Sequence, residues 1–300
     1  MGRDCSGCFN RKERRERKVL PLNPSQSGPP QGETGFSWPN ARALAERCSM
    51  AYHETESSLR IKGIAGKFVW NNQTDTEALV TVDSGLETPD CICVAFRGSS
   101  SLRDWLQDFK VNKEHPRKGL TWSDSYEVEA EVHRGFYENV ESISEDLVAQ
   151  VSDLCKNKTQ AGRPVPLFLT GHSKGGAEAT LCALELQRQK FNIAGIYLFG
   201  CPRVGNRAFA NIYNATLYEE TYRVVNENDI VPRVPGVLMG YKHVGQMIFL
   251  PVGGGWCENP SLMTLLLSDA LGLWGAYRHE TDVLLADHFI AAYQKRIQNL

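Results

Sequence analysis

Short apolar runs alternate with longer amphipathic stretches from Trp38 to the end of the chain. The apolar runs have the length and residue content of strands; they are ALVTV (78–82), CICVAF (91–96), PLFLT (166–170), IAGIYLF (193–199) and TYRVV (221–225). Apolar residues at three- and four-residue spacing predict helical stretches between them, such as Phe136, Val140, Ile143, Leu147, Val151 and Leu154. Strands that alternate with helices predict an α/β fold with a mostly parallel central sheet and helices on both faces.

The first 36 residues lack this pattern. They contain a basic run, RKERRERK at 11–18, and a stretch rich in proline, glycine, serine and glutamine. Such a composition cannot bury a core, so we expect residues 1–36 to be a disordered tail and residues 37–300 to be one folded domain. The formal net charge of -2 gives no electrostatic reason to expect nucleic acid as a partner.

A glycine-rich turn follows the apolar run at 166–170. Gly171-His172-Ser173-Lys174-Gly175 fits the G-x-S-x-G pattern, and the stretch after it, AEATLCALELQ, has the composition of a helix. In this order of strand, turn and helix, the pattern predicts a nucleophile elbow that lifts the serine hydroxyl above the sheet edge. The alternative is an ordinary strand-to-helix turn, because the bare pattern also occurs by chance.

A serine hydroxyl becomes a good nucleophile when a neighbouring base takes its proton and a carboxylate orients that base. In α/β-hydrolases the carboxylate and then the histidine follow the serine along the chain. Asp229 lies just past the run 221–225, so it would share a sheet edge with Ser173. Glu227 is a nearby competitor, and a loop-shaping role for Asp229 is the alternative.

Three histidines lie beyond Asp229, at His243, His279 and His288. His243 lies in a strand-like segment and is expected to be a packed or hydrogen-bonded core residue. His288 is expected to begin the last amphipathic helix, with Asp287 as its N-cap. The periodicity alone does not choose between His279 and His288 as the base.

Several separate blocks of the chain resemble the class 3 (fungal-lipase-like) lipases. They follow the family's order and are VAFRGSSSLRDW, VHRGFY, LTGHSKGG, NDIVPRVP, YKHVG and ADHFIAAY. The resemblance implies an α/β-hydrolase fold with a short lid. It also implies that Ser173 is the nucleophile, Asp229 the triad carboxylate and His288 the base.

The same resemblance suggests the rest of the site. The backbone N–H groups of Ser99 and Lys174 would form the oxyanion hole. Lys174 departs from the family, in which an apolar residue more often follows the nucleophile. The family's lid would correspond to residues 101–115, with apolar candidates Leu102, Trp105 and Leu106. The apolar face of a lid can move onto a lipid surface and uncover the acyl pocket.

These features predict a serine hydrolase that cleaves ester bonds of tri-, di- or monoacylglycerols at a membrane or droplet surface, without a metal or organic cofactor. A phospholipase A1, a soluble carboxylesterase or an acyltransferase on the same triad is the alternative. A non-catalytic lipid-binding scaffold is less favoured, because all three triad positions are occupied. No metal site is predicted, since His53-Glu54 and His279-Glu280 lack a second histidine and Cys5-x-x-Cys8 lacks a second pair.

The N-terminal sequence predicts a location. It has no apolar stretch of the kind that a secretory signal needs. It begins MGRDCS, which fits the myristoylation pattern on Gly2, and Cys5 and Cys8 are candidates for palmitoylation. Lipid chains together with the basic run at 11–18 would be sufficient for stable anchoring. We therefore expect a cytoplasmic enzyme held on a membrane by N-terminal acylation.

Overall fold

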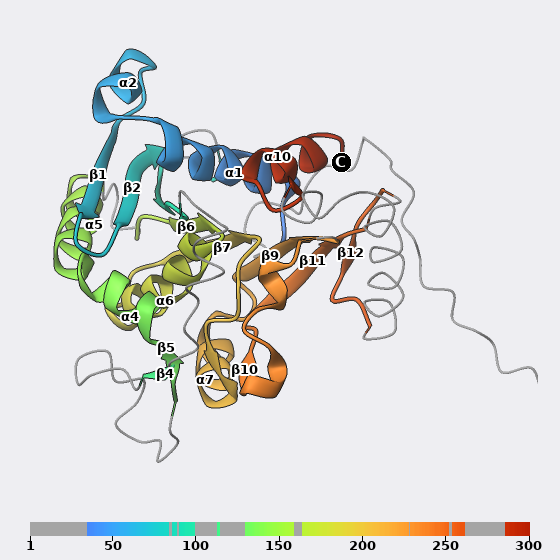
Figure 1. The fold of residues 1–300 in the computed structure, drawn as a ribbon. Coiled ribbons are helices and arrows are strands. Elements are labelled where there is room, and N and C mark those ends of the chain that lie inside the picture. The colour runs from blue at the N-terminus through green and yellow to red at the C-terminus, as the bar shows by residue number, and fades with distance from the viewer. Residues whose placement is uncertain are drawn as a thin grey trace, which may run out of the picture.

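The computed structural model describes residues 35–83, 86–88, 90–99, 113–114, 130–158, 164–227, 229–251, 254–261 and 286–300. In these residues the main sheet has the strand order β1-β2-β3-β6-β7-β9-β11-β12, and a smaller sheet has the order β10-β8-β5-β4 (Figure 1). The main sheet consists of β1 (Gly66–Asn71), β2 (Thr76–Asp83), β3 (Cys91–Phe96), β6 (Leu167–His172), β7 (Ile193–Phe199), β9 (Thr221–Asn226), β11 (Gln246–Leu250) and β12 (Cys257–Glu258). The smaller sheet consists of β4 (Lys113–Glu114), β5 (Val132–His133), β8 (Gly205–Asn206) and β10 (Tyr241–Lys242).

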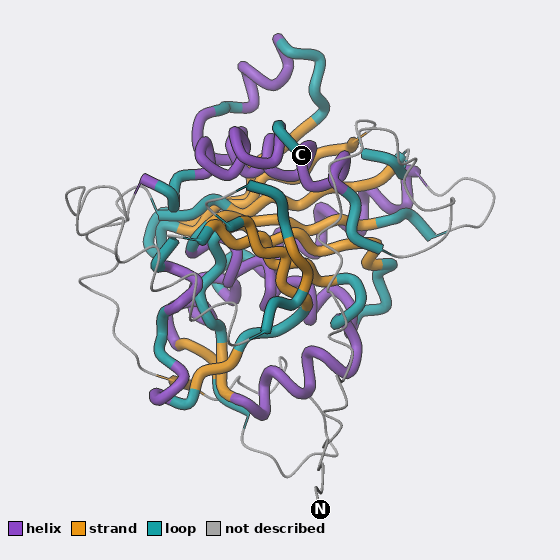
Figure 2. Tube along the Cα trace, turned by 90° about the vertical axis from the view of Figure 1, so that its right-hand side faces the viewer, coloured by secondary structure: helices purple, strands orange, loops and turns teal. Residues whose placement is uncertain are grey.

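The described helices are α1 (Trp38–His53), α2 (Glu56–Ile61), α4 (Arg134–Glu141), α5 (Ser144–Lys158), α6 (Lys174–Arg188), α7 (Arg207–Leu217), α10 (Ile290–Gln298) and the 3-10 turns η1 (Val231–Arg233) and η2 (Val237–Met239). Helices α1 and α10 cover one face of the main sheet, and α4, α5, α6 and α7 lie on the other (Figure 1). Figure 2 shows the strands in the middle, between the two layers of helices.

Strands β3, β6, β7, β9 and β11 pair in parallel, and β1, β2 and β12 extend the sheet by antiparallel pairing. Every residue of β3, β6 and β9 is buried, because helices cover both faces. This burial explains why the strands appear in the sequence as continuous apolar runs. The predicted fold class, a mostly parallel sheet between two helical layers, is confirmed.

The predicted tail lies outside the described residues except for its last two. Of these, Phe36 packs against the rings of Trp38, Tyr197 and Tyr222. The side chain at position 36 therefore belongs to the core that α1 and α10 form with the sheet. The division of the chain into tail and domain otherwise stays a prediction.

The continuous apolar periodicity over 136–154 corresponds to two helices, α4 and α5. The chain leaves the first helix at Ser142, whose hydroxyl donates to the carbonyl oxygen of Asn139 (2.7 Å) and also bonds the Thr74 hydroxyl (2.8 Å). Asn71 donates to the Ser142 carbonyl oxygen (3.4 Å). These contacts with the β1-β2 turn divide a stretch that looks uninterrupted in the sequence.

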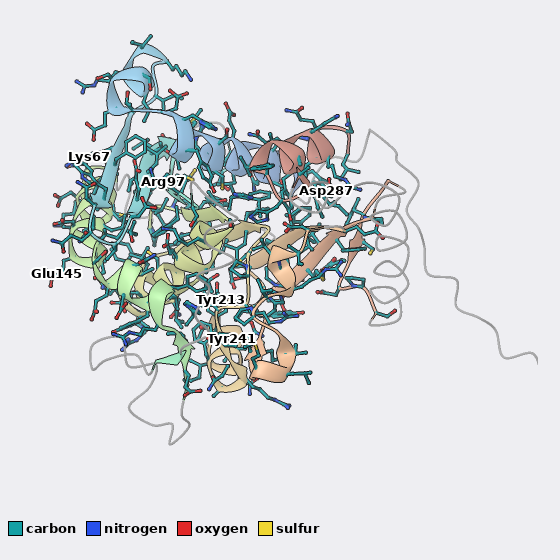
Figure 3. The ribbon with its side chains drawn as sticks, in the orientation of Figure 1. Lys67, Arg97, Glu145, Tyr213, Tyr241 and Asp287 are labelled. Atoms are coloured by element: carbon teal, nitrogen blue, oxygen red, sulfur yellow. The ribbon has the colours of Figure 1, made fainter. Side chains whose placement is uncertain are left out.

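The prediction that Asp287 is the N-cap of the last helix is wrong. Helix α10 begins at Ile290, and the residue before it, Phe289, has no side-chain capping bond. Asn226 donates to the carbonyl oxygen of Asp287 (2.9 Å), which lies just below α10 (Figure 3). His172 bonds the carbonyl oxygen of His288 (2.5 Å). Both carbonyl groups thus have tertiary partners instead of helical ones.

In the described part of the chain, no helix is both long enough and apolar enough to span a membrane.

Candidate active site

Ser173 lies at the turn between β6 and α6, at φ 58° and ψ −129°. This left-handed region is strained for a serine, as expected of a nucleophile elbow. Its backbone N–H donates to the Phe199 carbonyl oxygen (2.9 Å), which ties the turn to the end of β7. A Cβ atom on Gly171 would lie 2.2 Å from the Gly175 carbonyl oxygen, so the turn requires glycine there.

Asp229 and His288 are in contact next to this turn. The Nδ1 atom of His288 lies 2.9 Å and 2.8 Å from the two carboxylate oxygens of Asp229, and both side chains are buried. Since a carboxylate only accepts, Nδ1 carries the proton and Nε2 keeps its lone pair. That tautomer is the one a general base for a serine hydroxyl needs.

Two of the other acid and base candidates lie in the described residues, and the structure gives each a hydrogen-bond partner outside the proposed triad. The side chain of His243 is partly buried, and its Nε2 atom bonds the Pro232 carbonyl oxygen (2.6 Å), as expected for a hydrogen-bonded histidine. Burial, followed by the charges of Arg223 and Arg203, lowers its pKa well below the usual value. Glu227 accepts a bond from Arg233 through its backbone oxygen (2.7 Å). His279 lies outside the described residues.

Tyr293 is a further member of the site. Its hydroxyl donates to Asp229 Oδ2 (2.6 Å) and accepts from the Asn226 N–H (3.2 Å). Burial and the neighbouring Asp229 raise the pKa of Tyr293 well above its usual value, so the hydroxyl remains a donor. Sequence reasoning assigned it no role. The only available signal was its place in the block ADHFIAAY, five residues beyond the candidate base.

His172, the residue before the candidate nucleophile, contacts the candidate base. Its ring lies 4.6 Å from the ring of His288, measured between centroids, and its Nε2–H donates to the His288 carbonyl oxygen. Its Nδ1 therefore accepts from the Tyr52 hydroxyl (2.8 Å). Burial, and then His288, lowers the pKa of His172 well below its usual value. A neutral, doubly hydrogen-bonded His172 thus joins the elbow to the segment that carries His288.

The backbone at Gly200 leaves room for the acid and the base. Gly200 has φ +57°, and a Cβ atom there would lie 2.7 Å from Asp229 Oδ2 and 3.0 Å from His288 Nδ1. Any side chain at this position would push into the pair.

The two oxyanion-hole candidates lie on neighbouring segments. Lys174 is the first residue of α6, where backbone N–H groups have no acceptor within the helix. Ser99 follows β3 and is partly buried. A Cβ atom on Gly175 would lie 2.4 Å from the Phe96 carbonyl oxygen, so the start of α6 packs directly on the end of β3. This arrangement keeps the two candidate donors on adjoining pieces of backbone.

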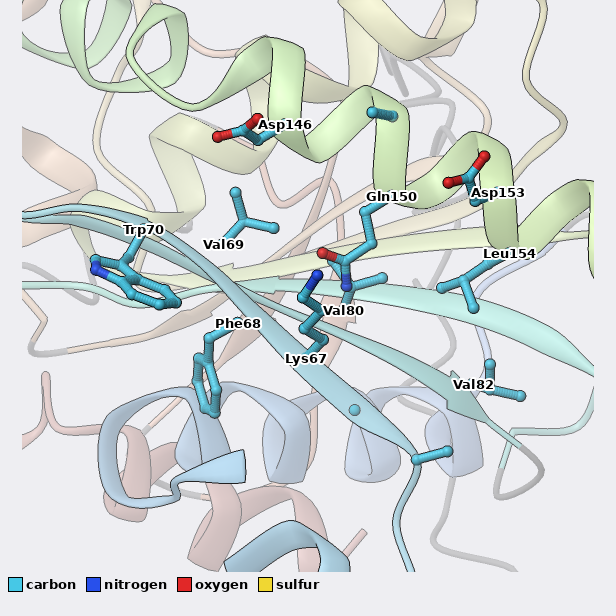
Figure 4. Close-up of a pocket in the computed structure, with 13 residues that line it drawn as sticks. Lys67, Phe68, Val69, Trp70, Val80, Val82, Asp146, Gln150, Asp153 and Leu154 are labelled. Carbon is cyan, nitrogen blue, oxygen red and sulfur yellow. The ribbon is translucent and has the colours of Figure 1, made fainter. Parts of the chain in front are cut away.

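A cavity of about 780 Å³ lies between β1, β2 and α5 (Figure 4). None of the triad candidates lines it. Among the described residues, no cluster of histidine, cysteine, aspartate or glutamate could hold a metal ion. The lid candidates Leu102, Trp105 and Leu106 and the acylation candidates Gly2, Cys5 and Cys8 lie outside the described residues.

Residues 93–239 match the family model described as lipase (class 3). The chain is 37% identical over 177 residues to a lipase of Rhizomucor miehei, covering 57% of this chain and 44% of the relative. It is 31% identical over 201 residues to secreted mono- and diacylglycerol lipase 1 of Fusarium solani, covering 67% and 54%. The chain belongs to the class 3 lipase family. It spans about half the length of the curated relatives that it matches.

Solved lipase structures share the fold. The triacylglyceride lipase of Rhizomucor miehei aligns with a TM-score of 0.57 and 28% identity, covering 70% of this chain and 78% of that one. A second structure, described as a triacylglycerol lipase whose catalytic centre is a serine protease triad, aligns with a TM-score of 0.55 and 29% identity, covering 70% and 77%. The α/β-hydrolase fold implied by the sequence is confirmed.

The comparison overturns one prediction about this chain. We expected a cytoplasmic enzyme anchored by N-terminal acylation, and this expectation is wrong. Matching relatives from Penicillium cyclopium and Fusarium solani are described as secreted, and nothing in the comparison supports an acylated cytosolic form. The myristoylation and palmitoylation patterns are short, and such patterns occur often by chance.

Proposed function

We propose that this chain is a serine hydrolase that cleaves carboxylic ester bonds of glycerolipids through an acyl-enzyme at Ser173. The observation that carries the proposal is the buried contact of Asp229 with His288 beside a strained serine elbow. A carboxylate that fixes the Nδ1–H tautomer of a histidine gives that histidine a basic Nε2 atom, which suits removal of a serine proton.

In this mechanism His288 takes the proton of the Ser173 hydroxyl as the oxygen attacks the ester carbonyl. The backbone N–H groups of Ser99 and Lys174 stabilise the negative charge on the carbonyl oxygen. His288 then protonates the leaving alcohol, and an acyl-enzyme remains. Water repeats the cycle, with His288 as base, and releases the fatty acid.

The lipid class follows from the relatives. The relatives from Penicillium cyclopium and Fusarium solani are described as mono- and diacylglycerol lipases, and a solved triacylglyceride lipase shares the fold. A similar fungal lipase–inhibitor complex is described as a model for interfacial activation. We therefore propose mono-, di- or triacylglycerols at a lipid surface as substrates.

The experiment compares the wild type with Ser173→Ala on a panel of acylglycerols, phospholipids and short soluble esters, with products identified by mass. A fluorophosphonate probe should label only the wild type, and hydrolysis by the variant should fall to near background. Activity retained by a folded Ser173→Ala variant would refute the proposal. Cleavage of phospholipids alone would move the substrate class to phospholipase A1 chemistry.

A further inference from the structure

The lysine after the proposed nucleophile is buried. Lys174 is 5% exposed, although an ammonium group is costly to remove from water. Its Nζ atom donates to the Asp75 carbonyl oxygen (2.6 Å) and lies 3.4 Å from Glu178 Oε1. The charged end of this side chain thus lies in a polar site between α6 and the β1-β2 turn.

Glu178 completes that site. Its side chain is fully buried, and Oε1 also accepts from the Asn139 amide (2.6 Å). Oε2 has no hydrogen-bond partner within the described structure. Burial raises the pKa of Glu178, and the charge of Lys174 acts against that rise. A buried ion pair with an unsatisfied oxygen is often no more stable than apolar residues of the same size, so stability alone does not explain it.

Asp75 connects this pair to the other side of the proposed oxyanion hole. Its carboxylate pairs with Arg97, which also bonds Glu77 (2.8 Å) and lies beside β2 (Figure 3). Arg97 stands two residues before Ser99. Asp75 also has φ +48°, a left-handed conformation that aspartate and asparagine adopt more readily than most residues other than glycine. One turn residue therefore contacts the side chain of Lys174 and the segment that leads to Ser99.

We propose that Asp75, Lys174 and Glu178 are positioning residues that fix the two oxyanion-hole donors, the backbone N–H groups of Ser99 and Lys174, relative to each other. This inference rests on the proposed function. An oxyanion donor must be held within about 0.5 Å of its productive place. Loss of one donor costs about 10²- to 10³-fold in kcat, so a small displacement would be measurable.

The first test is Lys174→Met, which keeps an unbranched stem and removes the ammonium group. Glu178 is then a buried carboxylate without its cation, and its pKa rises further. A raised pKa in the folded state favours the protonated form, so the contribution of Glu178 to the stability of this variant is greatest at low pH and is lost as pH rises. For a short soluble ester we expect kcat to fall by at least about tenfold, with KM little changed. The loss should grow as pH increases.

The matched double variant is Lys174→Met/Glu178→Gln. Glutamine keeps an acceptor for Asn139 and removes the buried charge, so the additional alkaline loss should disappear and part of kcat should return. A role limited to stability would lower the melting temperature of Lys174→Met and leave kcat per folded molecule, measured by active-site titration, equal to wild type at every pH. That result would overturn the inference.

Asp75→Asn provides an independent test. It keeps the backbone oxygen that Lys174 bonds, tolerates the left-handed conformation and removes the charge that pairs with Arg97. We expect kcat to fall while KM stays within about twofold, as for loss of an interaction made in the transition state. The control is Asp153→Asn, because Asp153 forms only an exposed pair with Lys156 (3.4 Å) among the described ion pairs.

The outcomes separate this inference from the proposed function. If the wild type shows no Ser173-dependent turnover, the proposed function fails. If the wild type turns over esters and Asp75→Asn matches Asp153→Asn in kcat, the positioning role fails and the triad assignment stands.

Discussion

Tyr293 contributes to the site through its hydroxyl group, which donates to Asp229. Tyr293→Phe removes this donor and leaves the ring in place. Hydrogen bonds to charged groups contribute about 1.5–3 kcal/mol, so the free energy of unfolding should fall by that amount and kcat should also fall. The control is Tyr213→Phe, which removes a buried bond to Thr221 (2.9 Å) and should cost about 0.5–1.5 kcal/mol without a change in kcat. Denaturant unfolding and ester hydrolysis measure the two effects, and equal kcat values for both variants would contradict the role of Tyr293.

His288 is the residue on which the choice of base depends. Because triad members act as a unit, His288→Ala should reduce kcat about as much as Ser173→Ala, and combining the two should cost little more. Turnover of a short soluble ester by the three variants checks this. His279→Ala serves as the comparison: if it inactivates the enzyme while His288→Ala does not, His279 is the base.

At the scale of the elements, the end of β7 leaves room for the acid and base. Gly200→Ala adds a Cβ atom 2.7 Å from Asp229 Oδ2 at a residue with φ +57°. Left-handed backbone costs a non-glycine residue about 1–2 kcal/mol, and the clash adds to this, so both stability and kcat should fall. Gly236→Ala is the control, since nothing lies within 4 Å of a Cβ there. Similar melting temperatures and similar kcat values for the two variants would show that the acid and base tolerate a side chain at position 200.

The parallel strands could be predicted because burial on both faces makes them apolar throughout. The elbow could be predicted because its glycines lie close together in sequence. The start of α10 could not, because Asn226 and His172 bond the carbonyl oxygens of Asp287 and His288 from distant parts of the chain. The break between α4 and α5 has a similar cause in the contacts of Ser142 with the β1-β2 turn. Local periodicity contains no information on such long-range bonds.

The same limit applies to the candidate site. The position of Asp229 after a strand predicts that it is the carboxylate, and the family resemblance favours His288 over His279 as the base. The hydrogen bonds of Tyr293 and Tyr52 join residues far apart in the chain, and the block ADHFIAAY that contains Tyr293 does not indicate its partner. The burial of Lys174 was also not foreseeable, because Asp75 and Asn139 come from separate elements.

For the whole molecule, exposed apolar side chains adjoin the proposed triad. Ile230 directly follows Asp229 and is 38% exposed, and Phe289 directly follows His288 and is 57% exposed. Large apolar side chains that remain in water beside a site for lipids are suited to contact with a lipid surface. Ile61, at the end of α2, is distant in sequence from the proposed triad and is 87% exposed. It provides a comparison for Phe289.

Phe289→Ser should therefore lower hydrolysis of emulsified long-chain acylglycerols more than hydrolysis of short soluble esters. Complete burial of a phenylalanine side chain contributes about 1.5–3 kcal/mol, and because Phe289 is partly covered already, we expect a loss of about 1 kcal/mol, or about fivefold, in binding to the lipid surface. The kcat for a soluble ester should stay near wild type, since the hydrogen bonds of His288 are unchanged. Ile61→Ser should affect neither substrate. Equal losses on both substrates for Phe289→Ser would mean that this side chain supports the fold of the site, and the proposed contact with lipid would then be wrong.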